Sequence, residues 1–272
     1  VSQDGKNLDF KRVGNAWYIT LLKKQNIGDR NEIVVGFSGK PQVSKRPPWS
    51  GGVSWKRDDN QNPFIVTTCQ GDGASLWWPC KDHQYDEPDS TLITVTVPEK
   101  LTDVSNGRLR SVVQNADHTQ TFTWFVSQPI NNYCVNLNIA DYVHFGEKYK
   151  GEKGTLDCDY YVLSYNLEKA KQQFREVPRM LEALEYWFGP YPFYEDSYKL
   201  VEVPYPGMEH QSSVTYGNDY KNGYKQTDES NTGWGYKFDF IIVHESAHEW
   251  FGNSITTKDI ADMWVHEAFG AY

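Results

Sequence analysis

The chain has 272 residues and an acidic balance, with 36 Asp and Glu against 27 Lys and Arg and a net charge of −9. This balance argues against a nucleic-acid partner, because phosphate recognition uses clustered Lys and Arg. Hydrophobic residues make up 39% of the chain, and no run of 18 apolar residues is present. We therefore expect a soluble globular protein without a transmembrane segment, long enough for one large or two ordinary domains.

The first part of the chain, residues 1 to about 160, alternates between short apolar runs and turn-forming residues. The runs have the length and the β-branched and aromatic content of strands, and Pro, Gly and Asn clusters separate them. Strands are predicted at residues 16–21, 32–37, 91–97 and 121–126. This pattern predicts an all-β domain at residues 1–160.

A helical period replaces the alternation from about Leu167. Apolar residues recur at helical spacing until Gly189, and Pro178 inside the run is expected to bend or split the helix. Further strands are predicted at 198–203 and 213–216, before a loop and two final helices. Residues 161–272 are therefore predicted to form a second domain, and the fold class to be mixed β and α+β.

Two histidines four residues apart mark the region that says most about chemistry. His244 and His248 enclose Glu245, and residues four apart on an α-helix share a face, so both imidazoles can reach one ion at about 2.0–2.1 Å. Glu245 lies about 100° further round the helix, where it can reach a water on that ion. The spacing predicts a zinc site with Glu245 as general base, and Gly252-Asn253 is the predicted helix stop.

A catalytic zinc needs a third protein ligand and an open position for water. Glu267 follows His248 after 18 residues and is the candidate. An ordinary amphipathic helix with two histidines is the alternative, because the bare motif is expected by chance roughly once in a hundred such chains. His266 points to another helix face than Glu267, so we expect it to be solvated or to support a ligand.

These residues carry a family resemblance that covers nearly the whole chain. The segment from His244 to Glu267, together with Trp250-Phe251-Gly252-Asn253 and Trp264–Phe269, resembles the aminopeptidase N and leukotriene hydrolase family of gluzincin metallopeptidases. Upstream, Pro206-Gly207-Met208-Glu209-His210 resembles the family's Gly-x-Met-Glu-Asn segment. Three motifs in family order are more specific than any one of them.

The resemblance implies a zinc-dependent aminopeptidase. It assigns one Zn²⁺ to the ligands His244, His248 and Glu267, with Glu245 as base. It also implies a saddle-shaped β domain at 1–160 and part of a thermolysin-like domain at 161–272. The family's catalytic domain continues beyond the position of Tyr272 and includes a Tyr that stabilises the oxyanion, so we expect these 272 residues alone to be weakly active or inactive.

The resemblance also implies how a substrate is held. Glu209, with Gly207 and Met208 before it, would bind the free amino terminus of a peptide. Gln70 resembles the position that reaches across from the amino-terminal domain to the substrate's first residue. Without the resemblance, Glu209 is interpreted as a surface carboxylate in a Pro-rich loop, and Gln70 as a polar residue at a strand end.

Two other functions remain open. An epoxide hydrolase of the leukotriene hydrolase type would use the same zinc, and a non-catalytic binding module would have no need for Glu245. The expected partners are peptides with a free amino terminus. The sequence does not set the oligomeric state, and a start at Val1 leaves the location open between the cytoplasm of a bacterium and its periplasm or exterior.

The chain departs from the family pattern at two positions. His210 stands where the family usually has Asn, and Ala268 where a Gly commonly follows the zinc-binding Glu. Ala268 is a small change in a helix. His210 could alter how the Glu209 segment is held, or could titrate near neutral pH.

The cysteines and an acidic stretch are the remaining candidates for a disulfide or a metal site. Cysteines at 69, 80, 134 and 158 lack paired zinc spacing, so free buried thiols are predicted, with a Cys134–Cys158 pair as the alternative. The stretch 82–89 is interpreted as solvated turn carboxylates, with a second metal site as the alternative.

Overall fold

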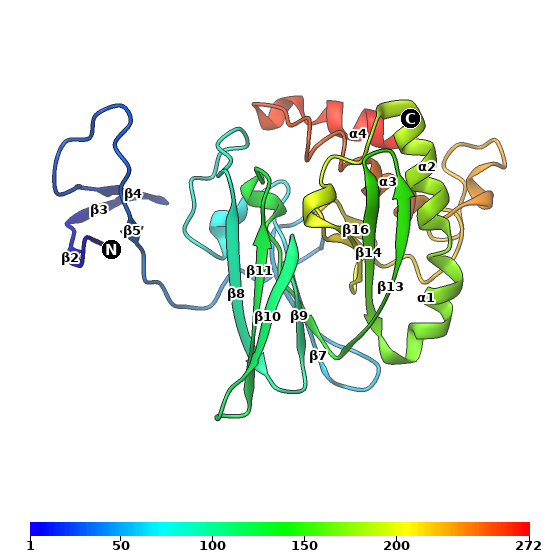
Figure 1. Ribbon diagram of the computed structural model, residues 1–272, viewed down its shortest axis with the longest axis horizontal. Coiled ribbons are helices and arrows are strands. Elements are labelled where there is room, and N and C mark those ends of the chain that lie inside the picture. Colours follow the sequence, from blue (N-terminus) through cyan, green and yellow to red (C-terminus); the bar gives the residue numbers. More distant parts are fainter. The chain divides into compact units, whose positions relative to one another are not determined.

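Strands dominate the computed structural model, which describes residues 1–272, and the α-helices all follow residue 166 (Figure 1). The chain divides into two units, residues 1–40 and residues 41–272. No helix is long and apolar enough to cross a bilayer. The fold class predicted from the sequence, mixed β and α+β, is confirmed.

The first unit consists of short strands. They are β1 (Ser2–Gln3), β2 (Lys6–Asn7), β3 (Phe10–Val13), β4 (Ala16–Ile19) and β5 (Ile33–Val34). They form a sheet of order β2-β1-β5 and a hairpin β3-β4. The strand predicted at 32–37 is reduced to two residues, because its partner β1 offers only two residues for pairing. Most of these side chains are exposed.

Two antiparallel sheets form the first part of the second unit. The three-stranded sheet has the order β10-β11-β8, with β8 (Thr91–Pro98), β10 (Arg108–Gln114) and β11 (Thr119–Val126). The four-stranded sheet has the order β6-β7-β12-β9, with β6 (Gly52–Arg57), β7 (Pro63–Thr68), β9 (Thr102–Val104) and β12 (Asn138–Ala140). Alternate residues of β11 are buried, as a sheet with one face on a core requires.

A five-stranded sheet of order β13-β14-β15-β17-β16 carries the site. Its strands are β13 (Tyr142–Gly151), β14 (Gly154–Leu163), β15 (Tyr198–Glu202), β16 (Gly207–Met208) and β17 (Val214–Tyr216). β15 pairs in parallel with both β14 and β17, and all its residues are buried. β16 is the edge strand, so the segment after it leaves the sheet at its rim. β14 runs through residue 160, where the predicted domain boundary stays a prediction.

Helices cover this sheet (Figure 1). They are α1 (Leu167–Gln173), α2 (Glu176–Phe188) and α3 (Phe240–Ala247), and α4 (Trp264–Ala271) packs against α3. The predicted split of the first helix is confirmed, and Pro178 lies in the first turn of α2, where its missing N–H costs no intrahelical bond. Single 3₁₀ turns occur at Ala74–Leu76, Asn132–Cys134, Ser164–Asn166, Tyr194–Asp196, Gly235–Lys237 and Ile260–Asp262.

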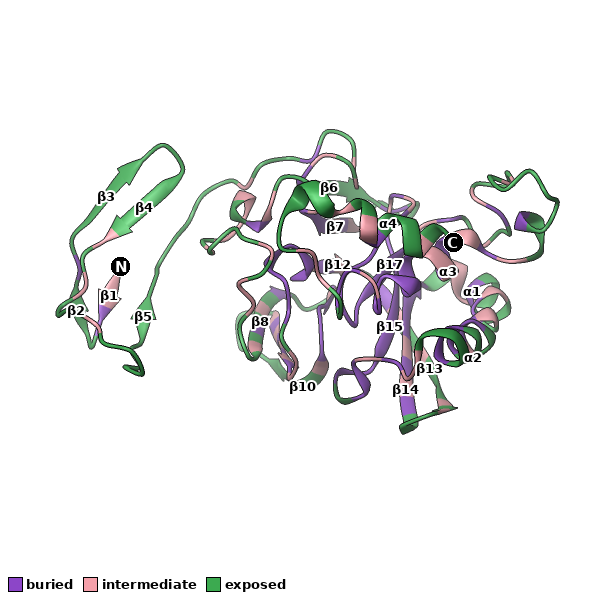
Figure 2. Cartoon of the chain, turned by 90° about the horizontal axis from the view of Figure 1, so that it is seen from above, coloured by how far each residue is buried: buried purple, intermediate pink, exposed green.

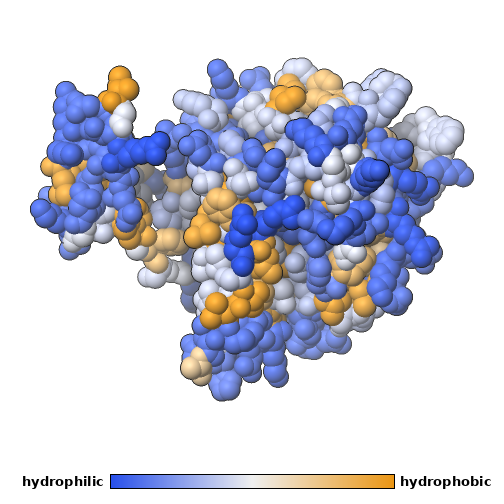
Figure 3. Space-filling view, viewed as in Figure 1, coloured by the Kyte–Doolittle hydropathy of each residue, from blue (hydrophilic) through white to orange (hydrophobic).

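Burial follows these layers. Figure 2 shows the inner strands β15 and β17 as buried and much of α4 as exposed. The face shown in Figure 3 is mostly hydrophilic, with an apolar patch over β10, where Val112 and Val113 are exposed. All four cysteines are free, and burial raises the thiol pKa of Cys69 to about 12. The Cys134–Cys158 pair is therefore not formed.

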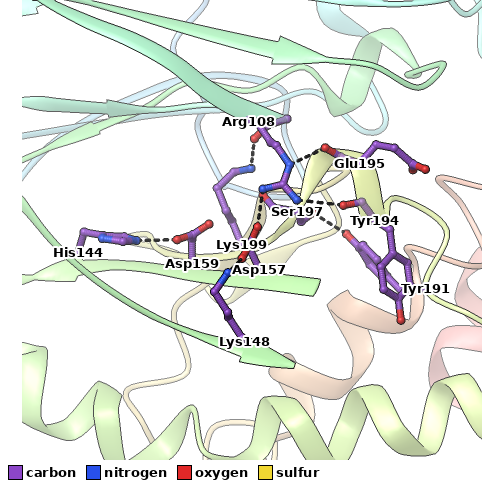
Figure 4. Close-up of polar contacts among 11 residues, drawn as sticks. Arg108, His144, Lys148, Asp157, Asp159, Tyr191, Tyr194, Glu195, Ser197 and Lys199 are labelled. Atoms are coloured by element: carbon purple, nitrogen blue, oxygen red, sulfur yellow. Dashed lines mark hydrogen bonds and ion pairs between the residues drawn. The ribbon is translucent and has the colours of Figure 1, made fainter. Parts of the chain in front are cut away.

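A polar network ties β10 to the five-stranded sheet (Figure 4). The Arg108 guanidinium donates to the carbonyls of Glu195 at 2.6 Å and Tyr194 at 3.1 Å, and pairs with Asp157 at 2.7 Å. The buried ammonium of Lys199, on β15, donates to the carbonyl of the residue before Arg108. These contacts hold the β layer against the sheet that positions the site.

Asp103, on β9, gives this fold a testable pH dependence. Burial raises the pKa of Asp103 to about 7, while Ser105 and Trp124 donate hydrogen bonds to it. A raised carboxyl pKa leaves the folded state binding more protons than the unfolded state between pH of about 4 and 7, so stability is lost as pH rises through that window. Asp103→Asn keeps an acceptor and removes the charge. Urea unfolding measures the free energy of unfolding of both proteins. The difference in favour of Asp103→Asn should grow from about pH 4 to about pH 7 and then stay constant. A difference that does not change with pH would contradict this.

Candidate functional site

The two histidines of the motif lie at the end of α3. Asp239 caps this helix, because its carboxylate accepts from the N–H groups of Ile241 and Ile242. The helix ends at Ala247 with His248 as C-cap, so the stop predicted at Gly252-Asn253 is wrong by one turn. The chain turns early because His248 and the residues after it form tight turns that lead toward α4. His248 still lies about one turn beyond His244, and both rings face the same side.

The side chains of His244, His248 and Glu267 converge. The two Nε2 atoms are 3.4 Å apart, and Glu267 Oε2 lies 3.5 Å from His244 Nε2 and 3.8 Å from His248 Nε2. Their ligand atoms all lie within 4.8 Å of one another, as a single-ion site requires. The sequence prediction that these three residues share one site agrees with this geometry.

The environment of the cluster orients the rings and leaves one side open. His248 is 1% exposed, and its Nδ1 lies 3.0 Å from the carbonyl of Phe251, so an Nδ1–H donor leaves Nε2 free as a ligand. The ring of Phe240 stacks on His244 with 5.0 Å between centroids. Glu267 is 49% exposed, so solvent or substrate can reach the cluster from the α4 side.

Charge in the cluster follows from these distances. Burial lowers the pKa of His244, but its hydrogen bond to Glu267 and the charge of Glu245 outweigh burial, so the pKa rises to about 9. The bond to His244 lowers the pKa of Glu267 to about 2. The carboxylate of Glu267 is therefore ionised, as a metal ligand must be.

Glu245 lies beside the cluster without joining it. The side chain is 7% exposed and faces the edge strand β16, where a Cβ on Gly207 would come within 2.8 Å of Glu245 Oε1. Glycine at this position therefore lets the carboxylate approach the strand. Burial, with the charges of Glu209 and Glu267, raises the pKa of Glu245 to about 8 against the opposing effect of His244.

Glu209 is buried, so the surface interpretation of this residue is wrong. It is 2% exposed and accepts hydrogen bonds at Oε1 from Gln70 Nε2 at 2.6 Å and from the Tyr133 hydroxyl at 3.3 Å. Gln70 Nε2 also lies 3.2 Å from Glu267 Oε1. The structure therefore brings Gln70 to the site across 139 positions of sequence.

A second grouping of ligand atoms overlaps the first. Glu209, Glu245 and His248 also lie within 4.8 Å of one another, and all three are buried. An ion there would take up both buried carboxylates, whereas two imidazoles and one carboxylate are a known catalytic zinc set. The donor chemistry therefore favours the site with His244 and Glu267. Neither grouping includes the acidic stretch 82–89.

Two further histidines lie close by. His210 is fully buried, and burial lowers its pKa to about 3, so the suggestion that it titrates near neutral pH is wrong. Its Nδ1 lies 3.4 Å from the Thr215 hydroxyl, which leaves a role in holding the Glu209 segment. His266 is also buried rather than solvated, and its Nε2 accepts from the N–H of Thr257 at 3.0 Å.

A cavity of about 210 Å³ opens on the cluster. Gly207, Met208, Glu209 and Gln70 line it, together with the residues of the cluster. The aromatic residues Trp49 and Tyr224 also line it, and sequence reasoning missed both because each lies in a loop without a motif. It missed Asn253 as well, whose amide donates to the carbonyl of Glu209 at 2.9 Å.

Comparison with known proteins agrees with this geometry. Residues 165–272 match the model of the Peptidase family M1 domain. The match covers less than half of the chain and shows that this part is similar to the M1 peptidase family. The family resemblance stated from the motifs is therefore confirmed.

Curated relatives extend the match upstream of the M1 domain. Leucine aminopeptidase 2 of Vanderwaltozyma polyspora is 25% identical over 282 residues, which cover 100% of this chain and 39% of the relative. Tricorn protease-interacting factor F2 of Thermoplasma acidophilum is 23% identical, over 93% of this chain and 30% of that protein. Mouse aminopeptidase B is 22% identical, over 97% and 37%. The chain thus spans less than half the length of these relatives.

Solved structures show the same fold. The M1 zinc metallopeptidase from Deinococcus radiodurans matches with a TM-score of 0.78 and 20% identity, over 100% of this chain and 57% of that chain. A variant of that enzyme bound to a Tyr-Ser-Ala substrate matches with a TM-score of 0.77 and 19% identity, over 100% and 58%. The M1 fold therefore covers the whole chain.

Gly270 on α4 lies against both imidazoles, which gives a test of the cluster. A Cβ there would come within 3.0 Å of His248 Cε1 and 3.4 Å of His244 Cε1. Gly270→Ala should therefore weaken Zn²⁺ binding on the order of 10-fold or more, although alanine favours the helix by about 1 kcal/mol. Zinc titration against a chromophoric chelator measures the affinity. Ala271→Ser, on the exposed part of the same helix, is the control; equal affinities for wild type and Gly270→Ala would contradict the geometry.

Proposed function

We propose that the protein is a zinc-dependent aminopeptidase, which removes the first residue from peptides that have a free amino terminus. The observation that carries this proposal is a buried carboxylate, Glu209, beside a cluster of two imidazoles and a carboxylate. The names of the curated relatives, leucine aminopeptidase 2 and aminopeptidase B among them, support the same activity.

The donor set fits zinc. Three ligands at about 2.0–2.1 Å from one tetrahedral ion lie about 3.3–3.4 Å from each other. The observed separations of 3.4, 3.5 and 3.8 Å are close to this, with Glu267 slightly further out. His244, His248 and Glu267 would hold the ion and leave the fourth position toward the open side. Zinc supplies Lewis-acid activation of water and of the substrate carbonyl.

Glu245 would move the proton. Its carboxylate accepts a proton from the water that attacks the peptide carbonyl, and it returns this proton to the amine that leaves when the C–N bond breaks. The products are a free amino acid and a peptide one residue shorter. The Glu245 carboxylate is buried next to Gly207, where little bulk water can reach it. The proton therefore passes between this carboxylate and the reacting groups rather than to solvent.

Glu209 would select the end of the chain. A buried carboxylate binds an α-ammonium strongly, because the pair is shielded from water and forms charge-assisted hydrogen bonds. The hydrogen bonds from Gln70 and Tyr133 fix one carboxylate oxygen. An internal peptide segment carries no ammonium, so it would leave this carboxylate unpaired and be rejected.

Replacement of the base separates binding from chemistry. Glu245→Gln should leave zinc bound and lower kcat by about 100-fold or more, because a glutamine cannot accept the proton. The measurement is hydrolysis of leucine p-nitroanilide by the full-length protein, with zinc content by atomic absorption. Glu182→Gln, exposed on α2, is the control. Undiminished turnover by a zinc-loaded Glu245→Gln protein would refute the assigned base.

Replacement of the anchor tests the choice of the chain end. Glu209→Gln keeps an acceptor for Gln70 but loses the charge, which typically costs about 2 kcal/mol or more for a buried pair and corresponds to about a 30-fold rise in KM. Peptides with free and with acetylated amino termini are compared. The preference for the free terminus should fall in the variant, and an unchanged preference would show that another group reads the ammonium.

A further inference from the structure

Lys199 is a buried lysine that the proposed mechanism leaves without a role. It lies on β15, the third of the five strands of the sheet that carries the site, and it is 1% exposed. Figure 4 shows its side chain reaching from β15 toward Arg108 at the start of β10. The ammonium donates to the carbonyl of Gly107 and lies 5.4 Å from the ring centre of Trp124. The acceptor that the protein provides for this buried charge is therefore a backbone carbonyl.

Packing alone does not explain a lysine at this position. Removing an ammonium from water is costly, and an apolar side chain of similar length would fill the same space without that cost. Burial accordingly lowers the pKa of Lys199 to about 8. Carboxylates from three elements oppose this shift, namely Asp159, Asp196 and Glu249. The guanidinium of Arg108, on a fourth element, adds to it.

The acceptor of Lys199 belongs to a turn that also contacts the Glu209 segment. The N–H of Gly107 donates to the Ser212 hydroxyl at 2.8 Å. The neighbouring Asn106 donates from its side chain to the carbonyl of the residue before Ser212, at 2.7 Å. Gly107 therefore lies between the buried ammonium on one side and the segment that carries Glu209 on the other.

The position of this turn depends on its hydrogen bonds. Gly107 has a φ of 73°, and a Cβ there would come within 2.1 Å of the carbonyl oxygen of Phe125, so only glycine fits. A glycine backbone rotates more freely than that of any other residue, so neighbouring contacts must hold it. Gly107 is buried, and without Lys199 its carbonyl would lose its charged donor. A buried carbonyl without a partner is costly, which favours a shift of the turn.

We propose that Lys199 is a positioning residue for the aminopeptidase reaction, because it holds the Gly107 turn against the segment that carries Glu209. This inference rests on the proposed function and adds a residue that acts from outside the catalytic cavity, which Lys199 does not line. Loss of Lys199 should weaken binding of the substrate's amino terminus, which Glu209 receives. The chemical step, which depends on Glu245 and the zinc ligands, should change little.

Replacement of the charge separates this role from packing. Lys199→Met keeps an apolar side chain and removes the ammonium. At pH of about 7 it should raise the dissociation constant of L-leucinamide about 5- to 20-fold and change kcat for leucine p-nitroanilide by less than about 2-fold. Calorimetry and hydrolysis assays on the zinc-loaded, full-length protein measure the two quantities. Lys148→Met is the matched control, since this lysine is exposed and pairs with Asp157. Equal affinities for wild type and Lys199→Met would overturn the inference.

Ser212→Ala tests the same connection from the other side. It removes the hydroxyl that accepts from Gly107, so it should also weaken leucinamide binding. If Lys199 acts through Gly107, the two substitutions together should cost less than the sum of their separate effects. Additive effects would show that Lys199 acts by another route and overturn the inference. Unchanged binding by Ser212→Ala would overturn it as well, and this result holds even where Lys199→Met does not fold.

The pH dependence provides a readout that a purely structural lysine would not change. The ammonium of Lys199 is charged below its pKa of about 8 and loses its proton above it. A charged donor forms the stronger hydrogen bond, so the ratio of dissociation constants, Lys199→Met to wild type, should fall toward one between about pH 7 and about pH 10. The α-ammonium of leucinamide titrates with both proteins and cancels in this ratio. A constant ratio would overturn the inference.

Further outcomes separate this inference from the proposed function. Leucinamide binding that is insensitive to Glu209→Gln would refute the ammonium anchor, and the inference with it. Binding that requires Glu209 but is unchanged in Lys199→Met would refute the positioning role and leave the aminopeptidase proposal intact. Hydrogen–deuterium exchange of residues 209–213 without ligand should be faster in Lys199→Met than in wild type. Unchanged exchange would overturn the structural step on which the inference depends.

Discussion

The site depends on a buried polar segment, residues 209–213, which follows the edge strand β16. All five residues are almost completely inaccessible to solvent, and backbone groups in such a place must find hydrogen-bond partners within the protein. Asn106 donates to the carbonyl of residue 211 at 2.7 Å, and Asn253 donates to that of residue 209 at 2.9 Å. Glu249 accepts from the N–H of residue 212 at 2.8 Å.

These bonds reach the segment from two sides. Asn106 lies in the turn between β9 and β10, whereas Glu249 and Asn253 lie just beyond the histidines of α3. The hydrogen bonds that this buried segment requires therefore connect the β layer to the end of α3. Glu209 is fixed beside the imidazoles as a consequence. The proposed division of labour, in which one carboxylate anchors an ammonium while three side chains hold zinc, depends on this placement.

Local chemistry explains what the sequence predicted well. The spacing of His244 and His248 needs only one helical turn to bring the rings together, and Asp239 starts that turn where a capping residue is expected. The β11 strand alternates as its sequence does, and Pro178 coincides with the start of a new helix. Glu267 meets the histidines as its position in the motif implied.

Long-range placement explains what the sequence could not predict. Gln70 and Glu209 are 139 positions apart in sequence. Nothing in the sequence around Tyr133 distinguishes it from an ordinary core aromatic residue, although its hydroxyl donates to Glu209 in the structure. Burial of Glu209 depends on layers from elsewhere in the chain, so its polarity alone suggested exposure.

Zinc K-edge X-ray absorption on the protein loaded with one equivalent of zinc tests the central claim most directly. The account predicts nitrogen and oxygen ligands at about 2.0–2.1 Å, with the scattering pattern of two imidazoles. That pattern should be lost in His244→Ala. A sulfur shell at about 2.3 Å would instead place the metal on the cysteines, and zinc that fails to bind at all would contradict the account outright.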